Sequence, residues 1–260
     1  MTDHFSRPVV ITRPLAQATP LAEKVAAIGR QAVVFPLLDI LPLPDQTELQ
    51  AALGDIGSYA MVAFVSPNAI EAAFAHVKQW PLHVALAVVG EGSKAALAQH
   101  GLTPANATIF SPLDPHRTDS QTLLDALDLA SLRGRRVLVI RGETGRELLA
   151  DALREQGVEV EQVAAYRRVA PVLDEDRRRT LLRLLDSPSD WLITSSEALR
   201  NLLQMVRDTA GEAGVAKMQR QTVVVPHVRI AETAQSLGFT CIVQTGSGDE
   251  PLLAALQFRA

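Results

Sequence analysis

The sequence predicts an α/β fold made of two similar domains, each a parallel β-sheet with helices packed on it. Short apolar runs alternate with helix-period segments almost from end to end of the 260 residues. This alternation is typical of buried parallel strands joined by helical crossovers. Segments of the first half also recur in the second half in the same order. A chain of this length can form one large domain or two smaller ones, and the recurrence favours two.

The individual strands are predicted from runs of four to six residues that are mostly apolar and rich in Val and Ile. In chain order they are residues 9–12, 32–35, 61–65, 84–89, 137–140, 158–163, 191–194, 222–225 and 240–243, with a shorter one near 108–110. Helical periodicity lies between most of them. Polar or acidic segments at 118–120 and 171–176 precede Leu-rich stretches, as helix entries do. Residues 111–120 are the most loop-like part of the chain because of their Pro and polar content.

The internal repeat extends over three pairs of segments. An offset of 128 residues places Val9 on Val137 and Gly29 on Gly157, and an offset of 129 places Ser66 on Ser195. An offset of 137 places residues 84–102 on residues 221–239. These matches suggest a duplication, although any two α/β units share some likeness at this level. In either case a cleft between two domains is the default ligand site.

The strand-to-helix junctions are the places where a ligand is expected. In a parallel sheet these turns share one edge, where each helix presents unpaired N–H groups and the positive end of its dipole. That edge favours anions. The junctions combine hydroxyl caps, small residues and basic side chains: 12–14, 66–68, 90–94, 141–146, 194–196 and 226–229. Each could also be an ordinary helix cap, but six together predict a ligand with several carboxylates or phosphates.

Composition and motifs exclude several classes of protein. A net charge of −4 argues against general nucleic-acid binding, and the apolar runs are too short to span a membrane. The first residues lack the pattern of a secretory signal, and Cys241 is the single cysteine, so we expect a cytoplasmic protein without disulfides. The histidines lack metal-site spacing, and no metal site is predicted. An enzyme with this sequence depends on positioning and electrostatics more than on a reactive side chain.

Seven segments, taken in order, resemble the uroporphyrinogen-III synthase family over nearly the whole chain. They are VVITRP, VVFPLLDI, VAFVSPNAIEAA, AVVGEGSKAAL, the long segment VLVIRGETGRELLADALREQGVEVEQVAAYRRV, WLITSSEAL and VVVPHVRIAETAQSLGF. The resemblance implies a cofactor-free lyase of tetrapyrrole (heme) biosynthesis. Such an enzyme cyclises linear hydroxymethylbilane to uroporphyrinogen III, with loss of water and inversion of ring D. Its substrate is a small polycarboxylate that also closes spontaneously to the wrong isomer.

The resemblance also implies how the chain divides into domains and which partners it has. Residues 1–36 and 171–260 would form one discontinuous domain and residues 41–163 the other, joined by a two-stranded extended linker at 35–40 and 164–170. A simple repeat would instead divide the chain near residue 130, but the Pro-edged, extended character of both linkers favours the family arrangement. We expect a monomer, with the upstream bilane-producing deaminase as a partner, and neither nucleic acid nor membrane.

The resemblance assigns roles to particular residues. Tyr166 matches the tyrosine of the family's cleft and is the candidate catalytic residue, as a helper for departure of the hydroxyl; an interdomain packing role is the alternative. The candidate substrate-binding residues are Arg13, Ser66, Asn68, Ser93, Arg141, Gly142, Arg146, Thr194, Ser195, Ser196 and Arg229. At the last junction many members have Gly-Pro-x-Thr-Ala where this chain has Pro226-His227-Val228-Arg229. We therefore expect Arg229 to replace a hydroxyl contact with a charge pair, and His227 to have a capping or exposed role.

Two other functions fit parts of the sequence. A two-domain anion sensor or solute-binding protein would use the same junctions without catalysis. A nucleotide-dependent enzyme would use the segment from Gly90 to Ala95, which fits G-x-G-x-x-A after a strand. That motif is weak, because Ser111-Pro112 stands where the ribose-binding acid belongs.

Overall fold

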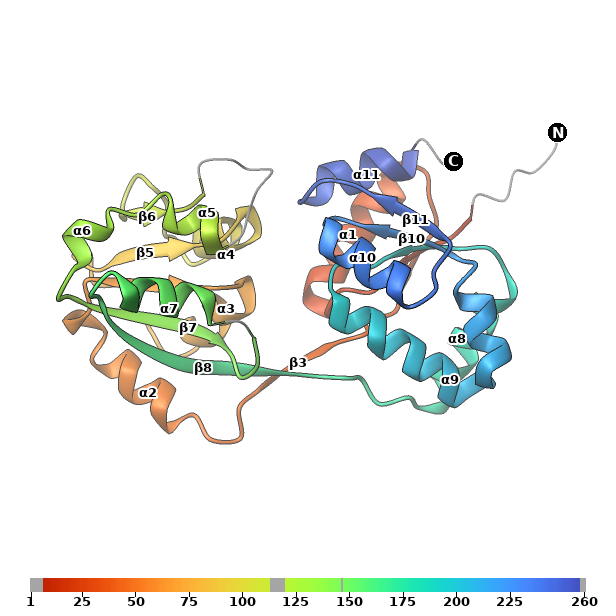
Figure 1. Ribbon diagram of the computed structural model, residues 1–260, viewed down its shortest axis with the longest axis horizontal. Coiled ribbons are helices and arrows are strands. Elements are labelled where there is room, and N and C mark those ends of the chain that lie inside the picture. The colour runs from red at the N-terminus through yellow and green to blue at the C-terminus, as the bar shows by residue number, and fades with distance from the viewer. Residues whose placement is uncertain (1–6, 113–119, 146, 258–260) are drawn as a thin grey trace. The chain divides into compact units, whose positions relative to one another are not determined.

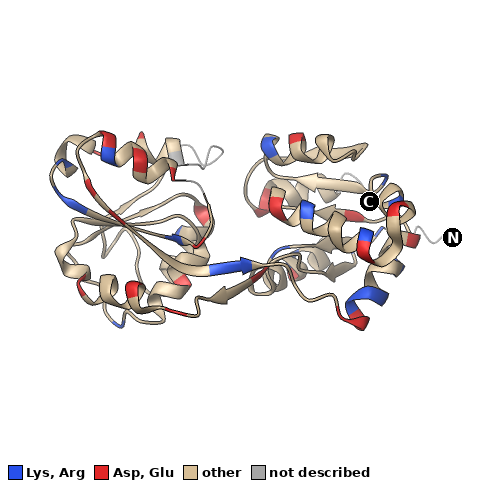
Figure 2. Cartoon of the chain, turned by 60° about the horizontal axis from the view of Figure 1, so that its bottom comes forward, with Lys and Arg blue, Asp and Glu red and all other residues tan. Residues whose placement is uncertain are grey.

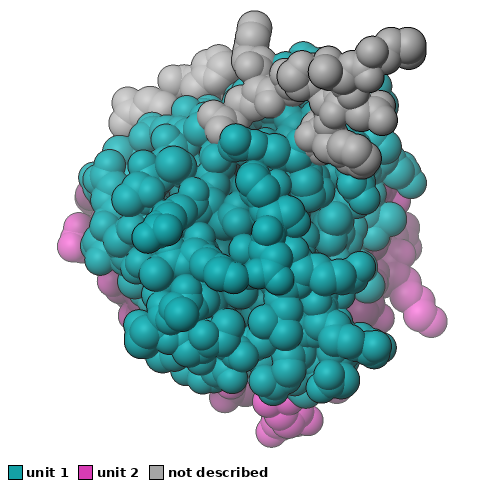
Figure 3. Space-filling view, turned by 90° about the vertical axis from the view of Figure 1, so that its right-hand side faces the viewer, with its two compact units in different colours: residues 1–39, 169–260 teal, residues 40–168 magenta. Residues whose placement is uncertain are grey.

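The computed structural model describes residues 7–112, 120–145 and 147–257 (Figure 1). It contains two compact units, coloured separately in Figure 3. Unit 1 comprises Met1–Asp39 and Val169–Ala260, and unit 2 comprises Ile40–Arg168. Residues 118 and 119 of the predicted helix entry lie outside the described residues, whereas Asp174 caps the helix that begins at Glu175.

Unit 1 is built on a five-stranded parallel sheet in the order β11-β10-β9-β1-β2. Successive residues of its strands point to opposite faces, and both faces are buried by helices. Val10 packs under α8, α9 and α10, whereas Val9 and Ile11 pack under α1 and α11. The strands are β1 (Val9–Ile11), β2 (Ala32–Val34), β9 (Asp190–Leu192), β10 (Thr222–Val225) and β11 (Cys241–Gln244). The helices are α1 (Leu15–Ala27), α8 (Glu175–Asp186), α9 (Ser196–Met218), α10 (Val228–Ser236) and α11 (Asp249–Gln257).

Unit 2 is built on a six-stranded sheet in the order β3-β8-β7-β4-β5-β6, with parallel pairing from β8 to β6. Helices α2, α3 and α4 cover one face, and α5, α6 and α7 cover the other. The strands are β3 (Asp39–Pro42), β4 (Met61–Phe64), β5 (Ala85–Val88), β6 (Ile109–Phe110), β7 (Arg136–Gly142) and β8 (Glu159–Val169). The helices are α2 (Thr47–Gly54), α3 (Pro67–Phe74), α4 (Glu91–Gln99), α5 (Ser120–Leu124), α6 (Leu129–Leu132) and α7 (Leu148–Glu155), with a 3₁₀ turn, η1 (Ile56–Ser58).

The predicted α/β class with parallel sheets is confirmed, and each of the nine predicted strands corresponds to a strand of the structure. Strand β3 falls partly in the segment expected to be a linker. Strand β8 continues through Val169, beyond the expected end at Val163, and so covers residues 164–169.

The two sheets repeat the same strand order, which supports the duplication suggested by the sequence. When β7, β8, β4, β5 and β6 are placed on β1, β2, β9, β10 and β11, the two orders coincide. The register coincides as well. Val9 pairs with Asp190 in unit 1, and their equivalents Val137 and Met61 pair in unit 2.

The helix ends of the repeat carry the same feature. Gly29 and Gly157 follow equivalent helices at φ 77° and 79°, and Gly101 and Gly238 do so at φ 78° and 84°. A positive φ after the last helical residue is the usual reason for glycine at a helix C-terminus, because a Cβ is disfavoured there. The agreement in order, register and helix ends goes beyond the general likeness of α/β units. Junctions at equivalent positions can therefore be compared directly.

Candidate active site

In each sheet, strands that follow one another in sequence are added first on one side of a central strand and later on its other side. We call the position between these two sets of strands the reversal point. In unit 1 this is between β1 and β9, and in unit 2 between β4 and β7. Ligands of open α/β sheets bind outside the carboxyl ends of the strands at such a position. In the view of Figure 2, acidic and basic residues are mixed on the helices of both units. Attraction for an anion therefore depends on particular side chains and helix ends at these two positions.

In unit 2 the reversal point brings Ser66 and Tyr166 together. Ser66 is the N-cap of α3, and its Oγ accepts a hydrogen bond from the Ala69 N–H at 3.2 Å. The same Oγ lies 2.9 Å from the Tyr166 hydroxyl, although 100 residues separate the two in sequence. Pro67 occupies the first turn of the helix, where its missing N–H costs nothing. The phenol oxygen of Tyr166 thus lies beside the positive end of α3.

A β-bulge aims Tyr166 at this point. Arg141 pairs with Ala164, but Gly142 pairs with Tyr166, so Ala165 is the extra residue on β8. The Glu143 N–H donates to the Tyr166 carbonyl oxygen at 2.8 Å and holds the strands together beyond the bulge. Bulges commonly redirect a side chain beside a functional site. Tyr166 is only 5% exposed here.

Gly142 provides the surface on which the Tyr166 ring lies. A Cβ on Gly142 would stand 3.0 Å from Cζ and 3.2 Å from the hydroxyl oxygen of Tyr166. The absence of a side chain at Gly142 therefore leaves the space that the Tyr166 ring occupies. Gly142 is buried under this ring and does not itself offer a side-chain contact to a ligand.

The other predicted residues of unit 2 lie at the same edge. The Arg141 side chain is 11% exposed, and its Nη1 lies 3.4 Å from Glu147 Oε1. Asn68 is half-buried in the first turn of α3, and Ser93 is buried in the first turn of α4. Arg146 lies outside the described residues.

In unit 1 the reversal point joins the ends of β1 and β9. Thr12 Oγ1 donates to the Leu192 carbonyl oxygen at 2.7 Å and ties the two strand ends together. Arg13 follows, and its Nη1 lies 2.7 Å from Asp249 Oδ1. Lys24 Nζ lies 2.7 Å from Asp249 Oδ2. Burial raises the pKa of Asp249, but hydrogen bonds from Lys24 and Arg13 outweigh burial and hold the pKa below its usual range.

The junction after β9 is a pair of hydroxyls in the first turn of α9. Ser195 Oγ accepts the Ala198 N–H at 3.0 Å, which is the same cap as Ser66 makes at the equivalent position of unit 2. Ser196 Oγ lies 2.9 Å from Thr233 Oγ1 of α10. Thr194 is half-buried just before them. These hydroxyls are therefore held by caps and by a neighbouring helix at the carboxyl edge.

The last junction has a histidine cap. His227 Nδ1 accepts the Arg229 N–H at 3.2 Å, so the Nδ1 lone pair is engaged in capping α10. Arg229 is exposed in the first turn of that helix. The capping alternative for His227 is what the structure shows.

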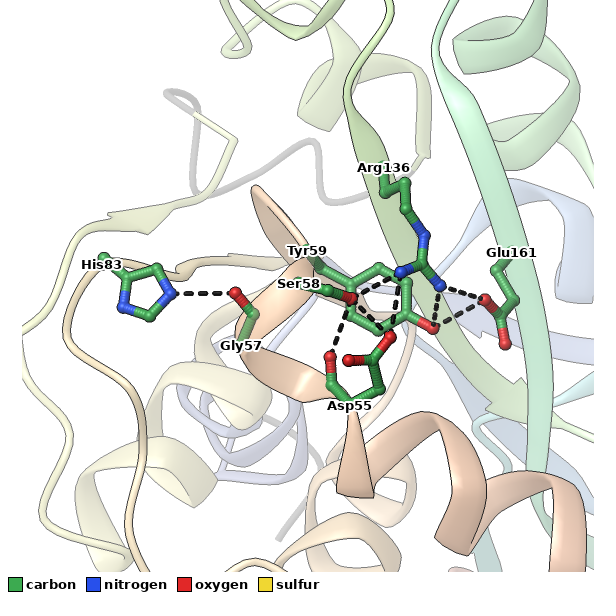
Figure 4. Close-up of polar contacts among 7 residues, drawn as sticks. All are labelled: Asp55, Gly57, Ser58, Tyr59, His83, Arg136 and Glu161. Carbon is green, nitrogen blue, oxygen red and sulfur yellow. Dashed lines mark hydrogen bonds and ion pairs between the residues drawn. The ribbon is translucent and has the colours of Figure 1, made fainter.

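The amino edge of the unit 2 sheet carries a charged cluster that is separate from the site (Figure 4). Arg136 lies over the Tyr59 ring at 4.4 Å and contacts Asp55 and Glu161 at 2.9 and 3.1 Å. The Tyr59 hydroxyl donates to Glu161 at 2.6 Å. Burial and then the Glu161 hydrogen bond raise the pKa of Tyr59. This cluster joins the starts of β4, β7 and β8, at the edge opposite the junctions.

Two features of the site were not predicted from the sequence. Asp249, the partner of Arg13, lies 236 residues away, and its only local signal is an acidic first turn on α11. The Ser66–Tyr166 pair has no local signal, because it depends on the order of strands in the sheet. Among the described residues, no group of three or more His, Cys, Asp and Glu side chains is placed to bind a metal. Nor does any helix in this part of the chain have the length and apolar character to cross a membrane.

Comparisons with known proteins match this chain to uroporphyrinogen-III synthases. The sequence profile of the family described as uroporphyrinogen-III synthase HemD matches residues 19–253. The uroporphyrinogen-III synthase of Salmonella typhimurium is 31% identical over 258 residues, covering 96% of this chain and 99% of that one. That of Escherichia coli is 28% identical over 256 residues, covering 96% and 99%.

Solved structures share the fold at lower sequence identity. The uroporphyrinogen-III synthetase of Helicobacter pylori has a TM-score of 0.61 at 15% identity, covering 97% of this chain and 99% of that one. A mutant uroporphyrinogen III synthase of Thermus thermophilus has a TM-score of 0.57 at 16% identity, covering 97% and 98%. The profile spans both units, and the Salmonella relative matches almost end to end. The chain therefore belongs to the uroporphyrinogen-III synthase family.

Proposed function

We propose that this chain cyclises linear hydroxymethylbilane to uroporphyrinogen III, with loss of water and inversion of ring D. The observation that carries the proposal is the family match over residues 19–253, which includes the whole reversal point of unit 2 and the β9 side of the reversal point of unit 1. The substrate has eight carboxylates, and both carboxyl edges present helix N-termini together with basic and hydroxyl side chains. We propose that Arg13, Thr194, Ser195, Ser196 and Arg229 in unit 1 bind these carboxylates, together with Asn68, Ser93, Arg141 and Arg146 in unit 2.

We propose Tyr166 as the group that assists departure of the hydroxyl. Ser66 Oγ already accepts the Ala69 N–H, and its own proton can be donated to the Tyr166 oxygen. In that arrangement the phenolic proton is directed to the leaving oxygen of the substrate, which departs as water. Negative charge that develops on the phenol oxygen is stabilised by the Ser66 hydroxyl and the positive end of α3. Ring D then attacks the methylene carbon from which the water has left and leads, through a spiro intermediate, to the inverted macrocycle. Ring D loses one proton in this closure, and that proton restores the phenol.

We propose further that a monomer of two folding domains, divided as in units 1 and 2, acts on this small molecule. The bilane comes from the upstream deaminase, in the cytoplasm. The relatives' names support a biosynthetic enzyme and give no support to the alternative of an anion sensor without catalysis.

The test is the isomer composition of the product. Purified protein is given freshly generated hydroxymethylbilane, the products are oxidised, and the type I and type III uroporphyrins are separated chromatographically. Predominantly type III product without added metal or nucleotide is expected. Type I alone, at the spontaneous rate, would refute the proposed function and favour the sensor.

Tyr166→Phe tests the role of the hydroxyl. It keeps the ring on Gly142 and is expected to slow turnover modestly, because it removes one positioned donor. A wild-type rate in Tyr166→Phe would leave the proposed function standing but would show that the Tyr166 hydroxyl takes no part in catalysis.

A further inference from the structure

The two reversal points carry arginines at equivalent positions. Arg13 and Arg141 are matched by the offset of 128 that aligns β1 with β7. Arg13 lies just after β1 and Arg141 is the second-last residue of β7, so both stand at the carboxyl end of a strand at the reversal point. Both side chains are largely buried, with 17% and 11% exposed. The same position of the duplicated fold therefore presents a guanidinium at the carboxyl edge in each unit.

Each arginine has a carboxylate partner, but the partners come from unrelated places. Arg141 reaches Glu147, six residues further along its own junction, at 3.4 Å. Arg13 reaches Asp249, the first residue of α11, at 2.7 Å. The duplication did not supply these two acids from one ancestral position. The carboxylate beside each arginine therefore was not inherited from a common ancestral unit, and each unit has its own.

Asp249 is held more firmly than a surface acid. Its side chain is 26% exposed, and its two oxygens are divided between Arg13 and Lys24, each at 2.7 Å. The carboxylate also stands at the N-terminus of α11, where negative charge is stabilised. Lys24, on α1, binds one carboxylate oxygen of Asp249. The other oxygen of Asp249 binds the Arg13 guanidinium and holds it in place.

This arrangement leaves Arg13 able to bind a second anion. A guanidinium has five N–H donors in a planar fork, and the contact with Asp249 engages Nη1. Arg13, Lys24 and Asp249 together carry a net charge of about +1 at neutral pH. A long side chain fixed before binding loses less conformational entropy when the ligand arrives.

Resting on the proposed function, we propose that Asp249 is a positioning residue, which orients Arg13 to receive one carboxylate of the substrate. Its loss frees the arginine to sample other rotamers and weakens substrate capture, while the chemistry at Tyr166 in unit 2 is unaffected. The expected signature is a change in KM without a change in kcat.

The experiment compares Asp249→Asn with Glu250→Gln in the full-length protein. Glu250 is exposed in the same first turn of α11, and its substitution removes the same charge from the same helix end without touching Arg13. We expect Asp249→Asn to raise the KM for hydroxymethylbilane roughly three- to tenfold at unchanged kcat. Glu250→Gln should keep the wild-type KM, and Asp249→Glu should recover most of the loss.

A charge exchange separates positioning from simple stabilisation. Arg13→Asp combined with Asp249→Arg should restore an ion pair, and with it the melting temperature, but it moves the guanidinium from the residue after Thr12 to the first residue of α11. KM should stay raised in this double variant. A wild-type KM in the exchange variant would mean that only the ion pair matters, and would refute the positioning role.

The controls keep the two proposals apart. If wild type forms type III product and Asp249→Asn has the same KM as Glu250→Gln, the inference about Asp249 is wrong and the proposed function stands. If wild type forms only type I product, the proposed function itself fails. Should Asp249→Asn not fold, as its melting temperature will reveal, Asp249→Glu and the charge exchange decide the question.

Discussion

Gly142→Ala is the substitution that tests the architecture of the site most directly. The new Cβ would lie 3.0 Å from Tyr166 Cζ and 3.1 Å from Cε2, whereas ordinary contact begins at 3.4 Å. The ring must therefore retreat by about 0.4 Å, the difference between 3.4 and 3.0 Å. Gly142 does not have a positive φ, so the backbone itself accepts alanine.

The size of the effect follows from this displacement. The Tyr166 hydroxyl lies 2.9 Å from Ser66 Oγ, near the long end of the range for hydroxyl pairs. A retreat of that size weakens this contact and misplaces the donor. A misplacement of about 1 Å can cost roughly a hundredfold in rate, so about 0.4 Å predicts a loss in kcat of roughly five- to tenfold.

The assay is kcat together with the ratio of type III to type I product. A slower enzyme leaves more bilane to close spontaneously, so the share of type I should rise. Gly92→Ala is the matched control, because its Cβ would lie 3.5 Å from Pro67 in ordinary contact at a neighbouring junction. This helical position should accept alanine with wild-type kcat.

A double variant shows whether Gly142 acts through the hydroxyl. Gly142→Ala should add little to Tyr166→Phe, because the hydroxyl that it displaces is already absent. Independent effects would instead multiply, to roughly a hundredfold in kcat if each single change costs about tenfold. A wild-type kcat and isomer ratio in Gly142→Ala would refute the reasoning that the ring must lie on a bare glycine.

Three further outcomes are expected. Ser66→Ala and Ser195→Ala each remove an equivalent helix cap and should each lower the free energy of unfolding by about 1 kcal/mol in urea titrations, but only Ser66→Ala should lower kcat. Because folding raises the pKa of Tyr59, the stability that Tyr59 contributes is complete below about pH 10 and is lost above it. Tyr59→Phe should therefore flatten the alkaline decline of the urea midpoint, and an unchanged decline would contradict this. Asp190→Ala removes the carboxylate that lies 2.7 Å from the buried Arg30 guanidinium and leaves its charge without a counter-ion, which should cost about 3–5 kcal/mol in unfolding free energy. Replacing both residues by apolar ones should cost less.

The sequence by itself determined the fold class, the nine principal strands and the hydroxyl caps Ser66 and Ser195. These features are local. Apolar runs identify buried strands, and a hydroxyl before a helical segment identifies a cap, as at Ser66 and Ser195. The repeat was also visible, because equivalent strands and glycines recur at nearly constant offsets. The candidate residues beyond these caps stay predictions that the proposed variants test.

Only the tertiary structure decided which junctions are neighbours. The order of strands places β4 beside β7 and β1 beside β9, and so defines the two reversal points. The pairing of Tyr166 with Ser66 depends on a bulge at Ala165 and on the bare surface of Gly142. The pairing of Arg13 with Asp249 depends on where α11 packs. Such contacts join residues 100 and 236 positions apart, and no local periodicity encodes a partner at that distance, because the order of strands is selected by packing of the whole sheet.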